Sequence, residues 1–374
     1  MSESSVSPRI SSMVKPVFTR HPENPIIVPG LYDWRRATVF NPGVLLDDDG
    51  RFYLYERAAG GLRPFICALG LLSSDDGVHF THVSDKPVFT PEMAGSEYGS
   101  VQDPRVHKMD GLYYLTFAFR PFAWSSHPTG VGVPESHETD FPGVERAPMA
   151  EINVGSGNVQ GGRPDNYTRS GIAVSEDRVN WRFLSWVTPA DMDDRDVILF
   201  PEKINGRYAA LRRPLHFVGP EYGVSGPSIW LSWSDDLLTW DDPVLVAKAE
   251  YEWEDNRIGG STPPLKTEQG WLVLYHGVQT EDKSVKRVVY RVGALLLDLN
   301  DPTKVIARTP EAIMEPEMYY ERFGTYIPNV IFPTGNIVKD GLLYLYYGVC
   351  DTAIALATVP MDALMEYILA YRNS

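Results

Sequence analysis

The sequence predicts an all-β protein, a five-bladed β-propeller that ends in a short helix and takes up residues 1–374 as a single domain. Three observations carry this prediction. A phrase made of a turn residue, a glycine and alternating aromatic and aliphatic residues occurs five times, a second acidic phrase lies between several copies, and helical periodicity is confined to the C-terminal end. With 374 residues, 43% of them hydrophobic, the chain can bury a large core.

The repeated phrase predicts five β-hairpins. It reads DDGRFYLYERA from residue 48, MDGLYYLTFAF from 109, INGRYAALRRP from 204, EQGWLVLYHGV from 268 and KDGLLYLYYGV from 339. The Asp-Gly, Asn-Gly or Gln-Gly pair supplies the positive φ of a tight turn, and the period-2 run after it is typical of a half-buried strand. We therefore expect equivalent turns at Gly50, Gly111, Gly206, Gly270 and Gly341.

The second phrase predicts how the hairpins are extended and assembled. It reads SSDDGVHFTHV, SEDRVNWRFLS and SWSDDLLTWDDP, and in each copy an acidic turn precedes the aromatic residue that starts the next strand. A repeat of this size is a small sheet that cannot bury both faces alone, so repeats must stack radially or as a solenoid. Five such sheets favour a propeller.

Two segments depart from the repeat. Residues 122–168 fill the widest gap between copies and are rich in Gly, Pro and Ser, which predicts a loop insertion over one rim, with a disordered surface loop as the alternative. The C-terminal MDALMEYILAYRN places Leu364, Ile368 and Leu369 on one helical face. We expect this helix to pack on the outside.

Composition restricts the possible partners. A net charge of -15 and a pI near 5.0 disfavour nucleic acid and anionic membranes as partners. Cys67 and Cys350 lie in apolar runs and form no CxxC motif, so we expect buried thiols and no metal site. The sequence shows no secretory h-region and no apolar run long enough for a membrane span, which predicts a cytoplasmic protein, free to form a homo-oligomer.

Polar residues recur beside the repeated strands. In a propeller, side chains at the ends of the innermost strands converge on one pocket. The recurring residues are Asn41, Arg57, Asp103, Asp196, Arg213, His276 and Asp351, with Arg195 and Arg257 close by. Carboxylates suit sugar hydroxyls and glycosidic oxygens, and guanidinium groups suit phosphate. Each residue alone has a structural alternative: a solvated turn for Asp103, a surface ion pair for each arginine and a core position for His276.

Seven phrases resemble a known family in the same order along the chain. They are FNPG, YLYERA, VQDPRV, DRDVILFPEKINGRYAALRRP, RIGGSTPPLKTEQGWLVLYHGV, YRVGALLLD and PNVIFPTGNIVKDGLLYLYYGVCDTAIALA. They resemble the β-mannoside phosphorylases and β-mannosidases of glycoside hydrolase family 130, which are five-bladed propellers. Several long phrases in order are far more specific than one motif.

The resemblance implies roles for individual residues. Asp103 in QDPRV matches the catalytic acid, which in the phosphorylases acts through the mannose 3-hydroxyl. The positions that hold the mannosyl unit are Asn41, Arg57 and Asp351. The phosphate pocket matches Arg195, Arg213, His276 and Tyr290, together with Arg257, which stands where a lysine is common. The family's usual HRP reads RRP here, with Arg212 in place of histidine.

The leading hypothesis is an inverting phosphorylase that acts on β-mannoside oligosaccharides, with inorganic phosphate as co-substrate and no cofactor. The cation cluster is the reason, because phosphate needs a cationic cradle to compete with water. A β-mannosidase of the same fold is the alternative, with Glu202 and Glu254 as candidates to activate water. A propeller that only binds carbohydrate or another protein is the third possibility.

Overall fold

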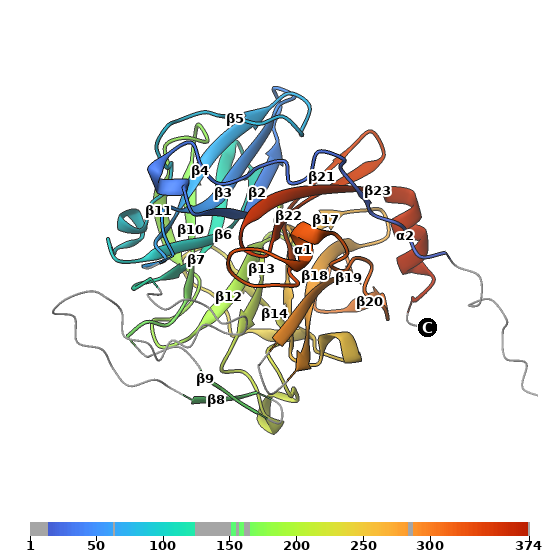
Figure 1. Cartoon of the computed structure of the whole chain (residues 1–374). Coiled ribbons are helices and arrows are strands. Elements are labelled where there is room, and N and C mark those ends of the chain that lie inside the picture. Colours follow the sequence, from blue (N-terminus) through green and yellow to red (C-terminus); the bar gives the residue numbers. More distant parts are fainter. Residues whose placement is uncertain are drawn as a thin grey trace, which may run out of the picture.

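The protein is a five-bladed β-propeller, as the repeats predicted (Figure 1). The computed structural model describes residues 14–62, 64–123, 151–154, 157–160, 165–282 and 287–372. Of the insertion expected at 122–168, residues 124–150, 155–156 and 161–164 lie outside the described part, and β8 (Glu151–Val154) pairs with β9 (Gly157–Gln160) within it. Figure 1 shows the sheets following one another around the molecule in chain order, from blue to red.

Each blade is an antiparallel sheet whose strands are hydrogen-bonded in nearly sequential order. The first three blades consist of β2 (Thr38–Leu46), β3 (Phe52–Ala59), β4 (Cys67–Ser74) and β5 (Thr81–His82); β6 (Ser100–Met109), β7 (Leu112–Arg120), β10 (Arg169–Ser175) and β11 (Arg182–Trp186); and β12 (Asp194–Leu199), β13 (Tyr208–Pro214), β14 (Ile229–Ser234) and β15 (Val244–Ala247). The fourth consists of β16 (Arg257–Gly260), β18 (Trp271–Asp282), β19 (Arg287–Leu297) and β20 (Val305–Arg308), with β17 (Leu265–Lys266) also paired to β18.

The fifth blade closes the ring with a strand from the other end of the chain. It consists of β21 (Ile331–Lys339), β22 (Leu342–Val349), β23 (Ala353–Pro360) and, at its outer edge, β1 (Thr19–Arg20). The first strands of neighbouring blades contact one another, β2 with β21 and β6, and β12 with β6 and β16. These first strands therefore line the centre, and pairing of β1 with β23 ties the start of the chain to its end.

Four of the five predicted glycine turns are equivalent, and the fifth, at Gly270, differs in φ and in the strands that it joins. Gly50, Gly111, Gly206, Gly270 and Gly341 all have positive φ, between 76° and 154°. Four of them join the first strand of a blade to the second, and Gly270 joins β17 to β18 in the fourth blade. Because an L side chain is strained at these angles, glycine fixes the tight turn on which each hairpin depends.

The acidic phrase also forms one recurring turn. In three blades a serine hydroxyl at the end of the third strand bonds to an aspartate two residues later, as in Ser74 to Asp76 at 2.8 Å. That aspartate accepts from the backbone N–H groups two and three residues further on, and these hydrogen bonds help to lower its pKa in all three blades despite an opposing effect of burial. Capping of these amides explains why the phrase precedes each outer strand.

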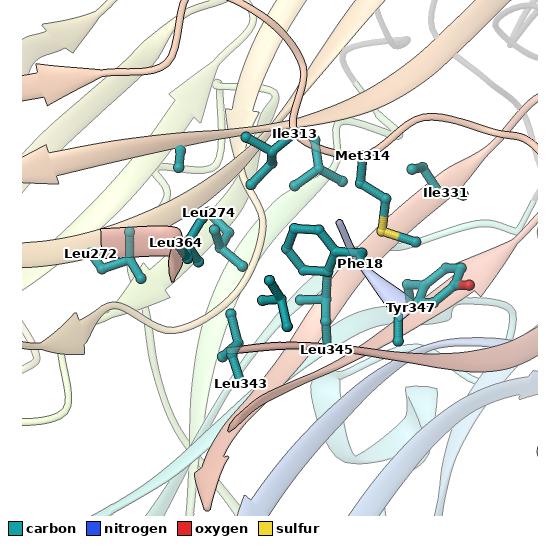
Figure 2. Close-up of a cluster of buried hydrophobic side chains, with 14 of the residues drawn as sticks. Phe18, Leu272, Leu274, Ile313, Met314, Ile331, Leu343, Leu345, Tyr347 and Leu364 are labelled. Atoms are coloured by element: carbon teal, nitrogen blue, oxygen red, sulfur yellow. The ribbon is translucent and has the colours of Figure 1, made fainter. Parts of the chain in front are cut away.

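The core lies mainly between blades rather than at one centre. Figure 2 shows one such cluster, in which Leu272 and Leu274 of β18 face Leu343 and Leu345 of β22. Phe18, directly before β1, packs into the same cluster. Clusters of this kind lie between each pair of neighbouring blades, so each sheet buries apolar side chains against the next one around the ring.

Helices are few and peripheral among the described residues. The predicted C-terminal helix is α2 (Met361–Leu369), which buries Leu364 and Ile368 and lies at the outer edge in Figure 1. The other short elements are α1 (Tyr319–Arg322) and the 3₁₀ turns η1 (Asp33–Arg35), η2 (Pro91–Ala94), η3 (Pro220–Tyr222) and η4 (Glu252–Glu254). Among the described helices, none has the length and apolar character needed to cross a membrane. Both cysteines are buried free thiols, as expected.

Candidate active site

Three first strands carry a bulge at the same place, near their start. The register shifts between Phe40 and Gly43 in β2, between Gln102 and Arg105 in β6, and between Arg195 and Ile198 in β12. Each bulge holds an Asx residue in the left-handed region, with φ of 45°, 50° and 52° for Asn41, Asp103 and Asp196. Asn and Asp tolerate this conformation best after glycine, and a bulge re-aims the side chain it carries.

The antiparallel partners bring further polar residues to the same end of the channel. Arg57 of β3 pairs with Phe40, Arg213 of β13 pairs with Arg195, and His276 of β18 pairs with Gly259. These residues thus lie near the starts of first strands or directly opposite them, whereas Tyr290 is on β19, the third main strand of its blade, and Asp351 follows the end of β22. Hairpin register, rather than sequence proximity, gathers them.

Asp103 is the central residue of one half of the site, which we call the acidic half and which also contains Asn41, Arg57 and Asp351. Its Oδ1 accepts hydrogen bonds from Asn41 Nδ2 at 2.7 Å and from Arg57 Nη1 at 2.9 Å, and its side chain is 16% exposed. The Arg57 guanidinium also stacks over the Phe40 ring at 4.3 Å and donates from Nε to Cys67 Sγ. Both donors bind one oxygen, which orients the second carboxylate oxygen of Asp103.

Asp351 lies near the same arginine. Burial raises the pKa of its carboxyl to about 7; Arg57 opposes this shift and the negative charge of Asp103 adds to it. Burial alone would lower the pKa of Arg57, but Cys67, Asp103 and Asp351 together raise it. The acidic half therefore holds a permanent guanidinium cation between two carboxyl groups, one of which titrates near neutrality.

The cationic half contains the five residues predicted to bind phosphate. Arg257 Nη2 donates to the Tyr290 hydroxyl, and Tyr290 stacks 6.0 Å from the His276 ring. Burial lowers the pKa of Arg257; contact with Tyr290 opposes this, and the charges of Arg213 and Arg195 add to it. Guanidinium groups that depress one another's pKa in this way lie close together and attract an anion.

His276 is fully buried and neutral at ordinary pH. Burial lowers the pKa of its ring to about 3; Asp196 opposes the shift, and Arg213, Arg257 and Arg105 add to it. Its Nδ1 lies 3.2 Å from the Ser261 hydroxyl, and its Nε2 has no hydrogen-bond partner among the residues the structure describes. The imidazole can therefore act as a hydrogen-bonding group beside the arginines without adding a charge.

Arg105 and Asp196 connect the two halves. Arg105 donates from Nη1 to the backbone oxygen of Asp103 at 2.9 Å and from Nη2 to Asp196 Oδ1 at 3.5 Å. Asp196 Oδ2 accepts from Arg213 Nε at 2.5 Å. Burial raises the pKa of Asp196, but Arg213, His276 and Arg105 outweigh it and hold the pKa well below its usual range.

The two glutamates considered as hydrolytic bases lie in other surroundings. Glu202 follows the far end of β12, beyond Leu199, and its half-exposed side chain pairs with Lys266. Glu254 is fully buried, and its Oε1 accepts from Arg308 at 2.6 Å and from the amides of Glu250 and Tyr251. Neither glutamate forms a hydrogen bond or ion pair with the acidic or cationic half in the described part of the chain.

Sequence reasoning missed Arg105 as a site residue and did not assign a role to Asp196. The available signal was the bulge itself, since an Asx residue in the third or fourth position of a first strand recurs in three blades. Arg212, the departure from the family pattern, donates to Asp194 at 2.8 Å and to Ser232, so it faces away from Arg213. Across the described residues no group of three or more His, Cys, Asp or Glu is placed to hold a metal ion.

The molecule is thus a five-bladed β-propeller that gathers an acid and an arginine cluster around the starts of its first strands. The sequence matches the family described as beta-1,4-mannooligosaccharide phosphorylase over residues 18–369, and the chain belongs to this family, glycoside hydrolase family 130. The resemblance read from the seven phrases is thereby confirmed.

Relatives and solved structures agree over almost the whole length. A 1,2-beta-oligomannan phosphorylase of Thermoanaerobacter sp. (strain X514) is 35% identical over 346 residues, which cover 91% of this chain and 96% of that protein. A beta-1,2-mannobiose phosphorylase of the same organism is 32% identical and covers 92% and 97%. The structure of a beta-1,2-mannobiose phosphorylase from Listeria innocua with beta-1,2-mannobiose has a TM-score of 0.70 at 25% identity and covers 94% and 99%.

Proposed function

We propose that this protein is an inverting β-mannoside phosphorylase that converts a mannosyl oligosaccharide and phosphate into mannose 1-phosphate and a shortened sugar. The observation that carries the proposal is the cluster of Arg195, Arg213, Arg257, His276 and Tyr290, which is connected to Asp103 through the buried pair of Asp196 and Arg105. A phosphate ion bound in this cluster would be held in position to attack the anomeric carbon. Such positioning is the main way for a site to favour phosphate over water as the nucleophile.

In the proposed reaction a phosphate oxygen forms a bond to the anomeric carbon as the bond from that carbon to the glycosidic oxygen breaks. Asp103 supplies the proton that the departing oxygen needs, relayed through the 3-hydroxyl of the mannosyl unit. Asn41 and Arg57 hold Oδ1 of Asp103, which leaves Oδ2 to face the sugar. Asn41, Arg57 and Asp351 hold the mannosyl unit itself, because amide, guanidinium and carboxyl groups match its hydroxyl groups.

We further propose a β-1,2-linked mannooligosaccharide as the substrate. Two relatives above 30% identity carry names that specify β-1,2-linked mannosides, and they cover more than nine-tenths of this chain. Phosphate is the co-substrate, and the mechanism uses no metal or organic cofactor. A cytoplasmic location, a single domain over residues 1–374 and the absence of nucleic-acid partners stay predictions, as does assembly into a homo-oligomer.

The placement of the two glutamates favours phosphorolysis over hydrolysis. A hydrolase of the same fold would need a carboxylate beside the attacking water. Oε1 of Glu254 already accepts from Arg308 and two backbone amides, its Oε2 is buried away from solvent, and Glu202 lies past the far end of its strand.

One assay tests the proposal. The purified protein is incubated with β-1,2-mannobiose in phosphate and in a phosphate-free buffer, and mannose and mannose 1-phosphate are quantified. We expect mannose 1-phosphate, with release of one mannose per turnover and little reaction without phosphate. Two mannose molecules per turnover at a rate independent of phosphate would establish the hydrolase, and no product in either buffer would favour a binding protein.

A further inference from the structure

A buried carboxylate lies beneath the cation cluster, enclosed by basic side chains from three blades. Asp196 is 3% exposed, and its Oδ2 accepts from Arg213 Nε at 2.5 Å and lies 3.5 Å from His276 Nε2. Its Oδ1 is 3.5 Å from Arg105 Nη2. One anion thus contacts Arg213 of its own blade, Arg105 of the second blade and His276 of the fourth.

The backbone around this carboxylate is shaped to admit it. Asp196 has a left-handed φ of 52° at the bulge of β12. Across from it, a Cβ on Gly259 would collide with Asp196 Oδ2 and would lie 2.6 Å from His276 Cε1 and 2.8 Å from Arg213 Nε. Only glycine at this point of β16 lets the fourth blade approach the carboxylate so closely.

The contact with Asp196 determines how Arg213 is presented. The guanidinium is planar, so a hydrogen bond from Nε to a fixed carboxylate sets the direction of both terminal nitrogens. Within the described part of the chain Arg213 Nη1 and Nη2 form no hydrogen bond, and the side chain is largely buried. Two fixed and unused donors match two oxygens of a phosphate ion.

Arg105 connects Asp196 to Asp103 and so fixes the position of Asp103 relative to Arg213. Besides its contacts with Asp103 O and Asp196, it donates from Nε to the backbone oxygen of Ser261 at 3.0 Å. All three nitrogens of this buried guanidinium are therefore used, on the second, third and fourth blades. Burial lowers the pKa of Arg105, and the charges of Asp196 and Asp103 oppose that shift.

We propose that Asp196 and Arg105 are positioning residues that fix the orientation of Arg213 and the separation between Asp103 and the phosphate pocket. This inference rests on the proposed phosphorylase function. Neither residue needs to touch the substrate. Their role is to keep the distance between the bound phosphate and the proton donor constant. The link is a continuous series of buried contacts from Asp103 O through Arg105 and Asp196 to Arg213.

The direction of the change in KM for phosphate distinguishes a positioning role of Asp196 from a purely electrostatic one. Asp196 is a negative charge close to the proposed phosphate site, so its neutralisation by itself would strengthen phosphate binding. If positioning dominates, an Asp196→Asn variant instead binds phosphate more weakly, because an amide no longer holds Arg213 Nε with a full charge. The two effects predict opposite changes in KM for phosphate.

The experiment compares Asp196→Asn with Asp194→Asn, a matched control. Asp194 is on the same strand, is fully buried and pairs with Arg212 at 2.7 Å, so its variant also loses a buried Asp–Arg ion pair. Its Oδ1 accepts from the backbone N–H of Arg213, and the amide oxygen of an asparagine can still accept that hydrogen bond. Initial rates with β-1,2-mannobiose are measured over a range of phosphate concentrations, and thermal unfolding is recorded for each variant. We expect KM for phosphate to rise about tenfold or more in Asp196→Asn, equivalent to about 1.4 kcal/mol, with KM for the mannoside unchanged. Asp194→Asn should lose stability without this split.

A second variant decides the question if Asp196→Asn does not fold. Arg105→Lys keeps the charge but has one nitrogen in place of three, so it cannot span Asp103 O, Asp196 and Ser261 O together. We therefore expect kcat at saturating substrates to fall about tenfold or more, again about 1.4 kcal/mol. An unchanged or lowered KM for phosphate in folded Asp196→Asn overturns the inference while wild-type phosphorolysis stands, as does a normal kcat in Arg105→Lys. A wild type that forms no mannose 1-phosphate overturns the proposed function and this inference together.

Discussion

Replacing Asp103 with asparagine should abolish proton donation while preserving the architecture around it. Asn41 Nδ2 and Arg57 Nη1 both donate to Oδ1 of Asp103, and an asparagine Oδ1 in the same place can accept both hydrogen bonds. What is lost in the fold is the full charge of one partly buried ion pair, with a side chain 16% exposed. We expect this to cost about 1 kcal/mol of unfolding free energy.

The effect on catalysis should be much larger. General acid catalysis contributes about 10²–10⁴-fold to rate, which corresponds to about 2.7–5.4 kcal/mol of activation free energy. Phosphorolysis of β-1,2-mannobiose by Asp103→Asn should therefore slow by two to four orders of magnitude, whereas an aryl mannoside with an acidic phenol as leaving group should lose far less, because that leaving group needs little protonation.

The assay measures kcat for both substrates together with thermal unfolding. Asp110→Asn is the matched control, since Asp110 is an exposed residue of the same blade with a left-handed φ of 51° at the hairpin turn. We expect its activity to be normal. Near-normal turnover of mannobiose by Asp103→Asn would show that Asp103 is structural, and equal losses on both substrates would exclude a role as proton donor.

The remaining predictions concern the cations, the second carboxyl group and the glutamates. Arg213→Ala should raise KM for phosphate by about one to two orders of magnitude, since one charge-assisted contact contributes about 1.5–3 kcal/mol; an unchanged phosphate dependence of initial rate would refute this. The folded protein keeps the proton of Asp351 up to a pKa of about 7, whereas the unfolded chain releases it near 3.8, so unfolding free energy should fall as pH rises through this window and Asp351→Asn should reduce that slope in urea titrations. Glu254→Gln should lower the melting temperature by weakening the pair with Arg308, and Glu202→Gln should leave stability and activity unchanged. A selective loss of phosphate-independent mannose release in either glutamate variant would instead support hydrolysis.

The local architecture of this protein could be predicted from the order of its residues. Each Asx-Gly or Gln-Gly turn and each Ser-x-Asp cap depends on contacts within a few residues. The five hairpins and the three outer turns can therefore be predicted from the sequence, and their repetition predicts five blades. Apart from Tyr290 and Asp351, the residues predicted for the pocket lie near the starts of first strands or opposite them in the hairpins, because hairpin register follows from turn position.

Which of these residues form hydrogen bonds and ion pairs with one another depends on the tertiary structure. The Asp196 carboxylate contacts Arg105, which is 91 residues away, and Glu254 contacts Arg308, which is 54 residues away. Likewise, nothing in the two-residue strand β1 indicates that it completes the last blade against β23. Contacts between blades depend on closure of the whole ring, which brings side chains from distant repeats within hydrogen-bonding distance, and no local turn or alternation carries that information.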